Sequence, residues 1–235
     1  MALPKHIRPE YSTTIPSTGK KIRYQPFSVK EEKILVLAAE STETDEISNA
    51  IRNVLTNCVT HPADFKVEEL ALFDIEYLFL KARSKSAGET ISVKVTDPND
   101  ETYSVDHEIN IDRIGVKKFD GHTNLIDLTE TTKVQMRYPD IQFFNDGINM
   151  DDISAATSII ARCVNQIIID DEEFTRADMK DKEIEEWLDG LTSGDLKKVT
   201  SFFDSMPKLT HSFTLKNPNT GEEFTTKLEG LADFF

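Results

Sequence analysis

Histidine and cysteine are the residue types in this chain that are best suited to chemistry. The five histidines are His6, His61, His107, His122 and His211, and the two cysteines are Cys58 and Cys163. Metal sites in proteins usually draw their ligands in pairs at short spacing along the chain. No two of the histidines and no two of the cysteines lie at such a spacing. We therefore expect surface or core histidines, and neither a metal nor a cofactor.

Both cysteines fall on the apolar stripes of predicted helices. The spacing predicts a helix over residues 45–58 that carries Cys58, and another over residues 152–168 that carries Cys163. A thiol on such a face behaves as a small hydrophobic group, whereas a nucleophilic cysteine needs an exposed, electropositive setting near a histidine. The pattern therefore predicts structural cysteines without a catalytic role.

Acidic residues offer a third kind of chemistry. The run from Asp170 to Glu173 lacks the alternating oxygen ligands, central glycine and closing glutamate of an EF-hand calcium loop. A cell-wall hydrolase would need two carboxylates facing each other across a cleft, and the abundance of acidic residues keeps this alternative open. Most of them, however, occupy predicted helix starts and loops, where charges are usually solvated. With no phosphate-binding loop, G-x-S-x-G elbow or H-E-x-x-H helix in the sequence, we expect no catalytic residues.

The composition limits the class of partner. The chain has 235 residues, of which 38% are hydrophobic, and a formal net charge of -15. Without a basic cluster, this charge disfavours nucleic acid. No apolar run reaches the length of a signal peptide or a membrane span, and two cysteines favour a reducing compartment. We predict a folded protein of the cytoplasm where it is made, bound to neither nucleic acid nor membrane.

The first half of the chain is predicted to contain two hairpins and three helices. A glycine that can take a positive φ, Gly19, predicts the turn of the first hairpin, and Ser28 with Glu31 has the capping-box spacing of a helix start. The turn Asp97-Pro98-Asn99-Asp100 marks the second hairpin. The predicted elements are a hairpin at 11–27, a mostly buried helix at 34–39, helices at 45–58 and 67–85, and a hairpin at 91–111.

The second half repeats this order. After strand-like runs at 126–128 and 134–138, helices are predicted at 152–168, 182–191 and 195–206, and a last hairpin turns at Asn217-Pro218-Asn219-Thr220-Gly221. We predict an α+β fold of two helix-plus-β-hairpin lobes with an N-terminal β-hairpin, and a weak internal duplication. The expected lobes are residues 1–114 and 125–235, joined by a connector at 115–124.

Several long segments give the chain a resemblance to a known family. They are LPK at 3–5, PSTGK at 16–20, FSVKEEKIL at 27–35, FDIEYLFLKARSKS at 73–86, FFDSMPKLTH at 202–211 and LEGLADFF at 228–235. In these segments, spread over its whole length, the chain resembles the T-even-type bacteriophage baseplate hub proteins.

The resemblance implies a non-enzymatic hub protein that acts through protein–protein contacts, as a hub subunit or as a hub assembly factor. Other baseplate hub or tail proteins are the implied partners. A chaperone of the tail tape-measure protein is the alternative within the same system. The implied location is the host cytoplasm during assembly, and the tail baseplate of the virion if the protein is a subunit.

One departure from the family concerns the tips of the two later hairpins. Some relatives are expected to carry C-P-x-C there, which is zinc-ribbon spacing, whereas this chain has Asp97-Pro98-Asn99-Asp100 and Asn217-Pro218-Asn219-Thr220. Asn and Asp side chains can hydrogen-bond the backbone of their own turn, so the turn shape does not require a metal. A zinc role is therefore not carried over to this chain.

The C-terminus contains the candidate partner-binding residues. Leu231, Phe234 and Phe235 share the spacing of one helical face, and two aromatic side chains are costly to leave in water. One hypothesis is that they dock into a hub partner as anchors. The alternative is that they fold back onto the core of their own chain.

Overall fold

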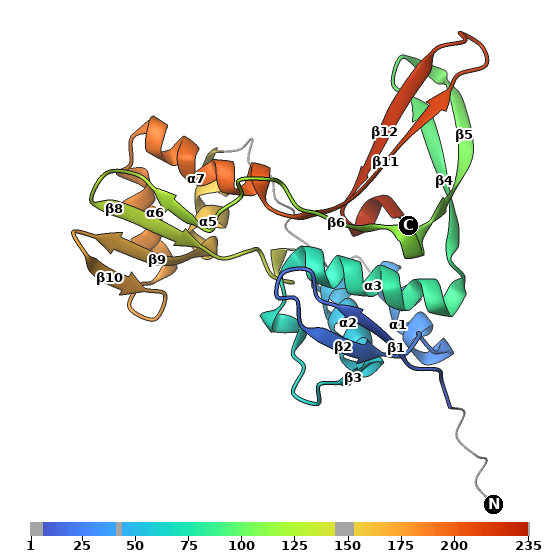
Figure 1. Ribbon diagram of the computed structural model, residues 1–235, viewed down its shortest axis with the longest axis horizontal. Helices are drawn as coiled ribbons and strands as arrows, with labels where there is room; N and C mark the ends of the chain where they lie inside the picture. Colours follow the sequence, from blue (N-terminus) through green and yellow to red (C-terminus); the bar gives the residue numbers. More distant parts are fainter. Residues whose placement is uncertain (1–6, 41–43, 144–152, 235) are drawn as a thin grey trace, which may run out of the picture. The chain divides into compact units, whose positions relative to one another are not determined.

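The computed structural model describes residues 7–40, 44–143 and 153–234 (Figure 1). The described part combines α-helices with antiparallel β-sheets, which confirms the predicted α+β class. Contacts between Cα atoms divide the chain into two compact units. Unit 1 contains residues 1–117 and 208–235, and unit 2 contains residues 118–207.

Unit 1 begins with the predicted N-terminal hairpin. Strands β1 (Tyr11–Thr14) and β2 (Lys21–Tyr24) pair antiparallel, and β3 (Val59–His61) pairs with the other edge of β2. The turn depends on Gly19, whose φ of 70° lies in the left-handed region that favours glycine. Its N–H donates to the Ile15 carbonyl at 2.8 Å.

Three α-helices follow in unit 1: α1 (Val29–Ala39), α2 (Thr44–Cys58) and, after a 3₁₀ turn, α3 (Leu72–Ala87). The predicted capping box of Ser28 and Glu31 is present at the start of α1. The prediction that this helix is mostly buried is wrong, because Val36 and Leu37 are exposed and Glu31 and Ala38 are its buried residues. The helix carries apolar residues on all of its sides, so their spacing could not indicate which side packs.

Helix α3 forms the centre of unit 1, as its apolar residues on several faces predict. Ile75, Leu78 and Ala82 have no exposed surface. Two acidic residues of this helix, Asp74 and Glu76, are buried as well. Asp74 accepts hydrogen bonds from the N–H of Ser17, at 2.9 Å, and from the hydroxyl of the same residue. The carboxylate therefore ties the first hairpin to the first turn of α3.

Unit 1 also contains two long hairpins, β4–β5 and β11–β12 (Figure 1). The strands are β4 (Thr90–Asp97), β5 (Asp100–Asn110), β6 (Gly115–Lys117), β11 (Lys208–Lys216) and β12 (Glu223–Glu229). Residues 208–210 of β11 pair with β6, in the sheet order β12-β11-β6. The last hairpin is therefore grouped with residues 1–117, whereas the sequence placed it in a lobe at 125–235. This pairing joins residues far apart in sequence, which periodicity does not reveal.

Within its described residues, 118–143 and 153–207, unit 2 includes an antiparallel sheet in the order β10-β9-β8-β7. Its strands are β7 (Leu125–Asp127), β8 (Thr132–Met136), β9 (Val164–Ile169) and β10 (Glu172–Thr175), and its helices are α5 (Ile153–Cys163), α6 (Asp181–Asp189) and α7 (Ser193–Ser205). The helix predicted over 152–168 is too long, because the chain becomes a strand at Val164. The run of β-branched residues that follows suits a strand as well as a helix, so its period was ambiguous. The acidic run begins in the tight turn of the β9–β10 hairpin, where Asp170 and Asp171 have φ of 49° and 67°.

The two units share one local arrangement around their cysteines. In unit 1 the Gln25 N–H donates to the Cys58 carbonyl at 2.8 Å, and in unit 2 the Arg137 N–H donates to the Cys163 carbonyl at 2.7 Å. In both, the cysteine ends a helix and the next residue starts a strand that pairs with the preceding hairpin. Both pairings shift register at this point.

Candidate functional site

The tips of the two long hairpins lie together in unit 1. The Asn217 Nδ2 amide donates to Asp97 Oδ2 at 2.8 Å and to Asp100 Oδ2 at 3.1 Å. Asp97 and Asn217 are 3% and 0% exposed. Each also holds its own turn, since Asp97 accepts from the Asn99 N–H and Asn217 from the Asn219 N–H, both at 2.9 Å. We name Asp97, Asp100 and Asn217 the tip cluster.

The tip cluster satisfies its polar atoms with hydrogen bonds. Both hydrogens of the Asn217 amide are used, one by each carboxylate, so neither is left unpaired in a buried place. Hydrogen bonds from Thr102 and from Asn217 lower the pKa of Asp100, which keeps this acceptor ionised. Within the described residues, no group of three or more His, Cys, Asp and Glu side chains is arranged for a metal ion. Aromatic pairs between the hairpins reinforce the contact: His107 stacks on Phe213 with ring centroids 4.4 Å apart, and Tyr103 meets Phe224 edge-on.

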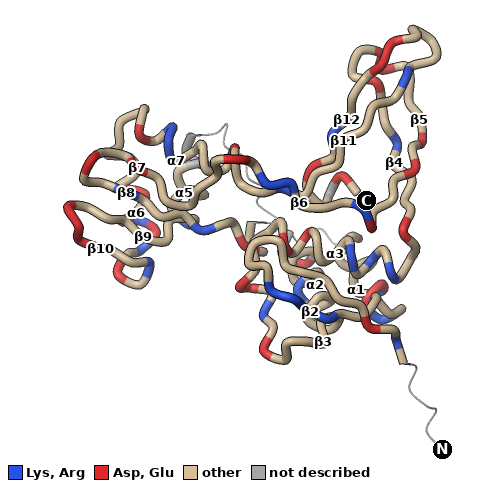
Figure 2. The backbone as a smooth tube through the Cα atoms, viewed as in Figure 1, with Lys and Arg blue, Asp and Glu red and all other residues tan. Residues whose placement is uncertain are grey.

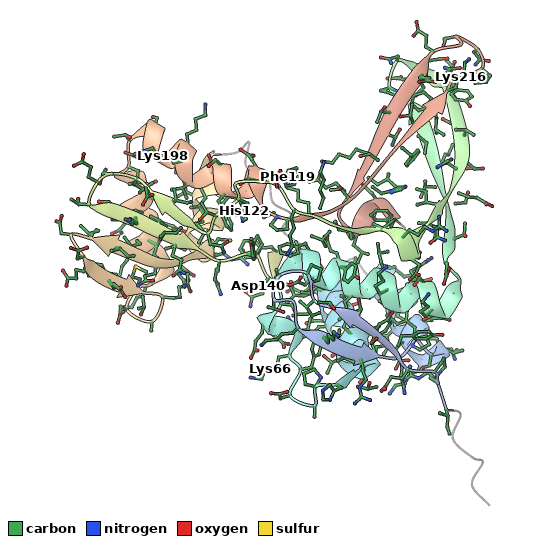
Figure 3. All side chains as sticks on the ribbon, in the orientation of Figure 1. Lys66, Phe119, His122, Asp140, Lys198 and Lys216 are labelled. Atoms are coloured by element: carbon green, nitrogen blue, oxygen red, sulfur yellow. The ribbon has the colours of Figure 1, made fainter. Side chains whose placement is uncertain are left out.

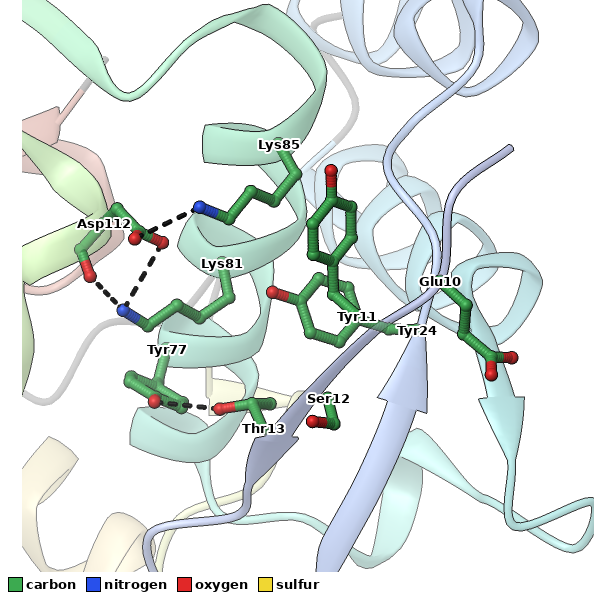
Figure 4. A pocket seen from close by; sticks show the side chains of 9 residues that line it. All are labelled: Glu10, Tyr11, Ser12, Thr13, Tyr24, Tyr77, Lys81, Lys85 and Asp112. Carbon is green, nitrogen blue, oxygen red and sulfur yellow. Dashed lines mark hydrogen bonds and ion pairs between the residues drawn. The ribbon is translucent and has the colours of Figure 1, made fainter. Parts of the chain in front are cut away.

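A polar pocket of about 500 Å³ lies where the first hairpin meets α3 (Figure 4). Lys85 Nζ lies 3.1 Å from Asp112 Oδ2 and 2.6 Å from Glu89, and Lys81 Nζ lies 3.7 Å from Asp112 Oδ1. Burial raises the pKa of Asp112, but the hydrogen bond and charge of Lys85, with the charge of Lys81, lower it overall. The lysines are thus neutralised within the pocket. This pattern is that of a structural ion-pair network, since a general acid or base needs a pKa near neutrality.

His122 is part of a polar cluster in unit 2 that the sequence did not predict (Figure 3). Its Nδ1 lies 3.0 Å from the Ser205 hydroxyl and its Nε2 lies 3.1 Å from the Tyr138 hydroxyl. The ring stacks on Tyr138 and contacts Phe202. Burial lowers its pKa, which favours the neutral imidazole. Ser205 donates its hydroxyl hydrogen to the Ser201 carbonyl of its own helix, so its oxygen is the acceptor for Nδ1–H. The histidine is half-buried and both of its nitrogens are hydrogen-bonded, and no spacing could have shown this because its partners lie up to 83 residues away.

Both cysteines face the core, as predicted. Cys58 and Cys163 have no exposed surface. Burial raises the pKa of each thiol to about 12. Since the thiolate is the reactive form, neither residue is set up as a nucleophile at neutral pH.

The candidate partner-binding residues at the C-terminus lie in a 3₁₀ turn, Leu231–Phe234, in unit 1. Leu231 and Phe234 are 3% and 1% exposed, and Phe235 lies outside the described residues. The Leu231 N–H donates to the buried Glu76 Oε1 at 3.0 Å. This geometry favours the alternative that the turn completes the core of its own unit. Docking into a partner stays a prediction that a truncation can test.

An apolar groove of about 200 Å³ in unit 2 is more accessible than the buried C-terminal turn. Residues of β9, β10, α6 and the segment between β10 and α6 line it, namely Ile167, Ile169, Phe174, Met179, Glu183, Ile184 and Trp187. Trp187, the single tryptophan of the chain, and Phe174 are half-exposed. Acidic residues outnumber basic ones in unit 2 (Figure 2). Unit 2 contains 19 acidic and 9 basic residues, so its formal charge of -10 is most of the -15 of the chain.

Hydrogen-bonded hairpin tips, neutralised ion pairs and buried thiols stabilise this α+β fold. Unit 2 adds an exposed apolar groove. In the described part of the chain, no helix is long and apolar enough to cross a membrane. The model of the T4 bacteriophage base plate protein family matches residues 8–235. The chain therefore belongs to this family. No curated protein and no solved structure gives a significant match.

Proposed function

We propose that this protein works in the hub of the phage baseplate through protein–protein contacts, without catalysis, as a hub subunit or hub assembly factor. The family match over residues 8–235 is the observation that carries the proposal. The site geometry supports it, because the candidate chemical groups are buried, neutralised or hydrogen-bonded, as the tip cluster and the two thiols are.

The groove of unit 2 is the surface we propose for a baseplate partner. Its apolar lining suits an aliphatic or aromatic anchor, and the acidic surroundings favour a segment in which Lys or Arg flanks that anchor. Replacement of Phe174 by Ser should reduce co-purification with hub proteins from infected cells. Phe213→Ser, a half-exposed strand phenylalanine of unit 1, is the matched control. Equal loss in both variants would contradict the groove as the binding surface.

Two experiments test the function itself: deletion of the gene, and mass spectrometry of purified wild-type particles. Loss of complete baseplates is expected on deletion, because a hub protein acts during assembly. Stoichiometric recovery of the protein from purified particles would identify a subunit, and its absence would identify an assembly factor. Co-purification with the tape-measure protein alone would favour the chaperone alternative. Normal baseplates in the deletion would contradict the proposal.

A further inference from the structure

Helix α1 presents an apolar side to solvent. Val29, Val36 and Leu37 are 66%, 57% and 67% exposed, whereas Ala38 on the opposite side is 6% exposed. At about 100° per residue, the three exposed aliphatic side chains fall on one face of the helix. Single exposed aliphatic residues are common, but three on one face of an 11-residue helix form a patch.

Two opposite charges frame Val36 and Leu37 symmetrically. Lys33 and Glu40 lie on the same face, and both stand equally far in sequence from the midpoint between Val36 and Leu37. Both side chains are exposed, and neither forms an ion pair with another residue that the structure describes. The face therefore has a positive end and a negative end around an apolar centre.

Such a face is complementary to itself when a second helix runs in the opposite direction. About a two-fold axis through the centre, Lys33 of each copy would face Glu40 of the other, and Val36 would meet Leu37. Each contact then occurs twice, as in isologous dimers. A parallel arrangement would place like charges side by side, which is unfavourable.

We propose that α1 is a dimerisation surface, on which the α1 helix of a second copy of this chain docks antiparallel. The exposed Lys30 lies on the side of Leu37, but Glu40 disfavours a strongly acidic partner, whereas a second copy pairs Lys33 with Glu40 at both ends of the contact. One pair of short helices buries less than the roughly 1,200–2,000 Å² of a standard interface. The dimer is therefore weak, with a dissociation constant of about 10 μM or higher.

Sedimentation of the purified full-length chain over about 10–500 μM tests the proposal, since this range spans such an affinity. A reversible monomer–dimer equilibrium is expected. Leu37→Ser should weaken it by about tenfold or more, because the side chain meets its partner at the axis. A chain that remains monomeric over the whole range would overturn the proposal, and so would a dimer that Leu37→Ser leaves unchanged.

Charge reversal then tests the antiparallel geometry. Lys33→Glu and Glu40→Lys should each weaken the dimer by about tenfold, because each places two like-charge pairs in the interface. The double variant K33E/E40K restores opposite charges and should recover the wild-type affinity to within about threefold. Lys20→Glu changes the net charge as Lys33→Glu does, but lies in the exposed turn of the first hairpin, and should leave the dimer unchanged. A double variant as weak as the single ones contradicts the antiparallel contact, and circular dichroism verifies that all variants are folded.

Discussion

Replacement of Glu76 by Gln should make the protein more stable above neutral pH. Burial raises the pKa of Glu76, the N–H of Leu231 lowers it, and the charges of Glu229 and Asp233 raise it again, to about 7 overall. The ordinary value is 4.5. A folded pKa above the unfolded one means that the folded state retains a proton more strongly. The stability is therefore full below pH 4.5 and decreases as the pH rises through 7.

The pKa shift of Glu76 gives the expected size of the stability difference between Glu76→Gln and wild type. At 1.36 kcal/mol per pKa unit, ionised Glu76 costs about 3 kcal/mol of folding free energy at pH 8. Gln cannot ionise, and its Oε1 can still accept the hydrogen bond of Leu231. We expect Glu76→Gln to stabilise the protein by about 1–3 kcal/mol at pH 8 and by about 0 at pH 4.5, since the wild-type carboxyl is then protonated when folded.

Urea unfolding followed by circular dichroism, repeated between pH 4.5 and pH 8.5, measures this difference. The stability difference between Glu76→Gln and wild type should rise between about pH 4.5 and pH 7 and level off above pH 7. Glu101→Gln, at an exposed position of β5, is the control and should show no such rise. A difference that stays constant with pH would refute the reasoning, because it would show that Glu76 ionises equally in the folded and unfolded chain.

Three further predictions concern the cysteines, the hairpin tips and the C-terminus. Cys58→Ser and Cys163→Ser should each cost about 1–3 kcal/mol in urea unfolding but leave phage assembly intact at moderate temperature, because a hydroxyl replaces a buried thiol. Elemental analysis should find no stoichiometric zinc in the wild type and about one zinc per chain after replacement of Asp97, Asp100, Asn217 and Thr220 by Cys, since the two tips converge. Deletion of Phe234 and Phe235 should lower the melting temperature, because Phe234 is buried; unchanged melting with lost hub co-purification would instead indicate partner docking.

The local features of the fold were predictable because their causes lie within a few residues. The glycine of the first turn, the capping box of Ser28 and Glu31, and the apolar faces that bury both cysteines all depend on short-range spacing. The switch from helix to strand at Val164 was missed, since a β-branched run fits both periods. The exposed face of α1 was missed for a related reason: apolar residues on all sides do not indicate which side packs.

The sites depend on contacts that no local pattern encodes. Asn217 meets Asp97 across 120 residues, and Leu231 meets Glu76 across 155. The two Asx-Pro-Asn turns were recognisable singly, and the repeat suggested that they are equivalent, but their convergence required the structure. A pair of turns that recur at equivalent places in a repeat is therefore a signal worth testing for contact.

The two proposed contact surfaces differ in charge, so each should favour a different kind of partner. The groove lies in unit 2, which contains most of the net negative charge, so a second copy would be repelled there and a basic segment attracted. The face of α1 carries charges of both signs, Lys33 and Glu40, and favours its own copy. Salt should therefore weaken partner binding at the groove more than dimerisation through the apolar centre of α1. Because the surfaces occupy different units, Phe174→Ser should leave the dimer unchanged, and Leu37→Ser should leave the groove intact.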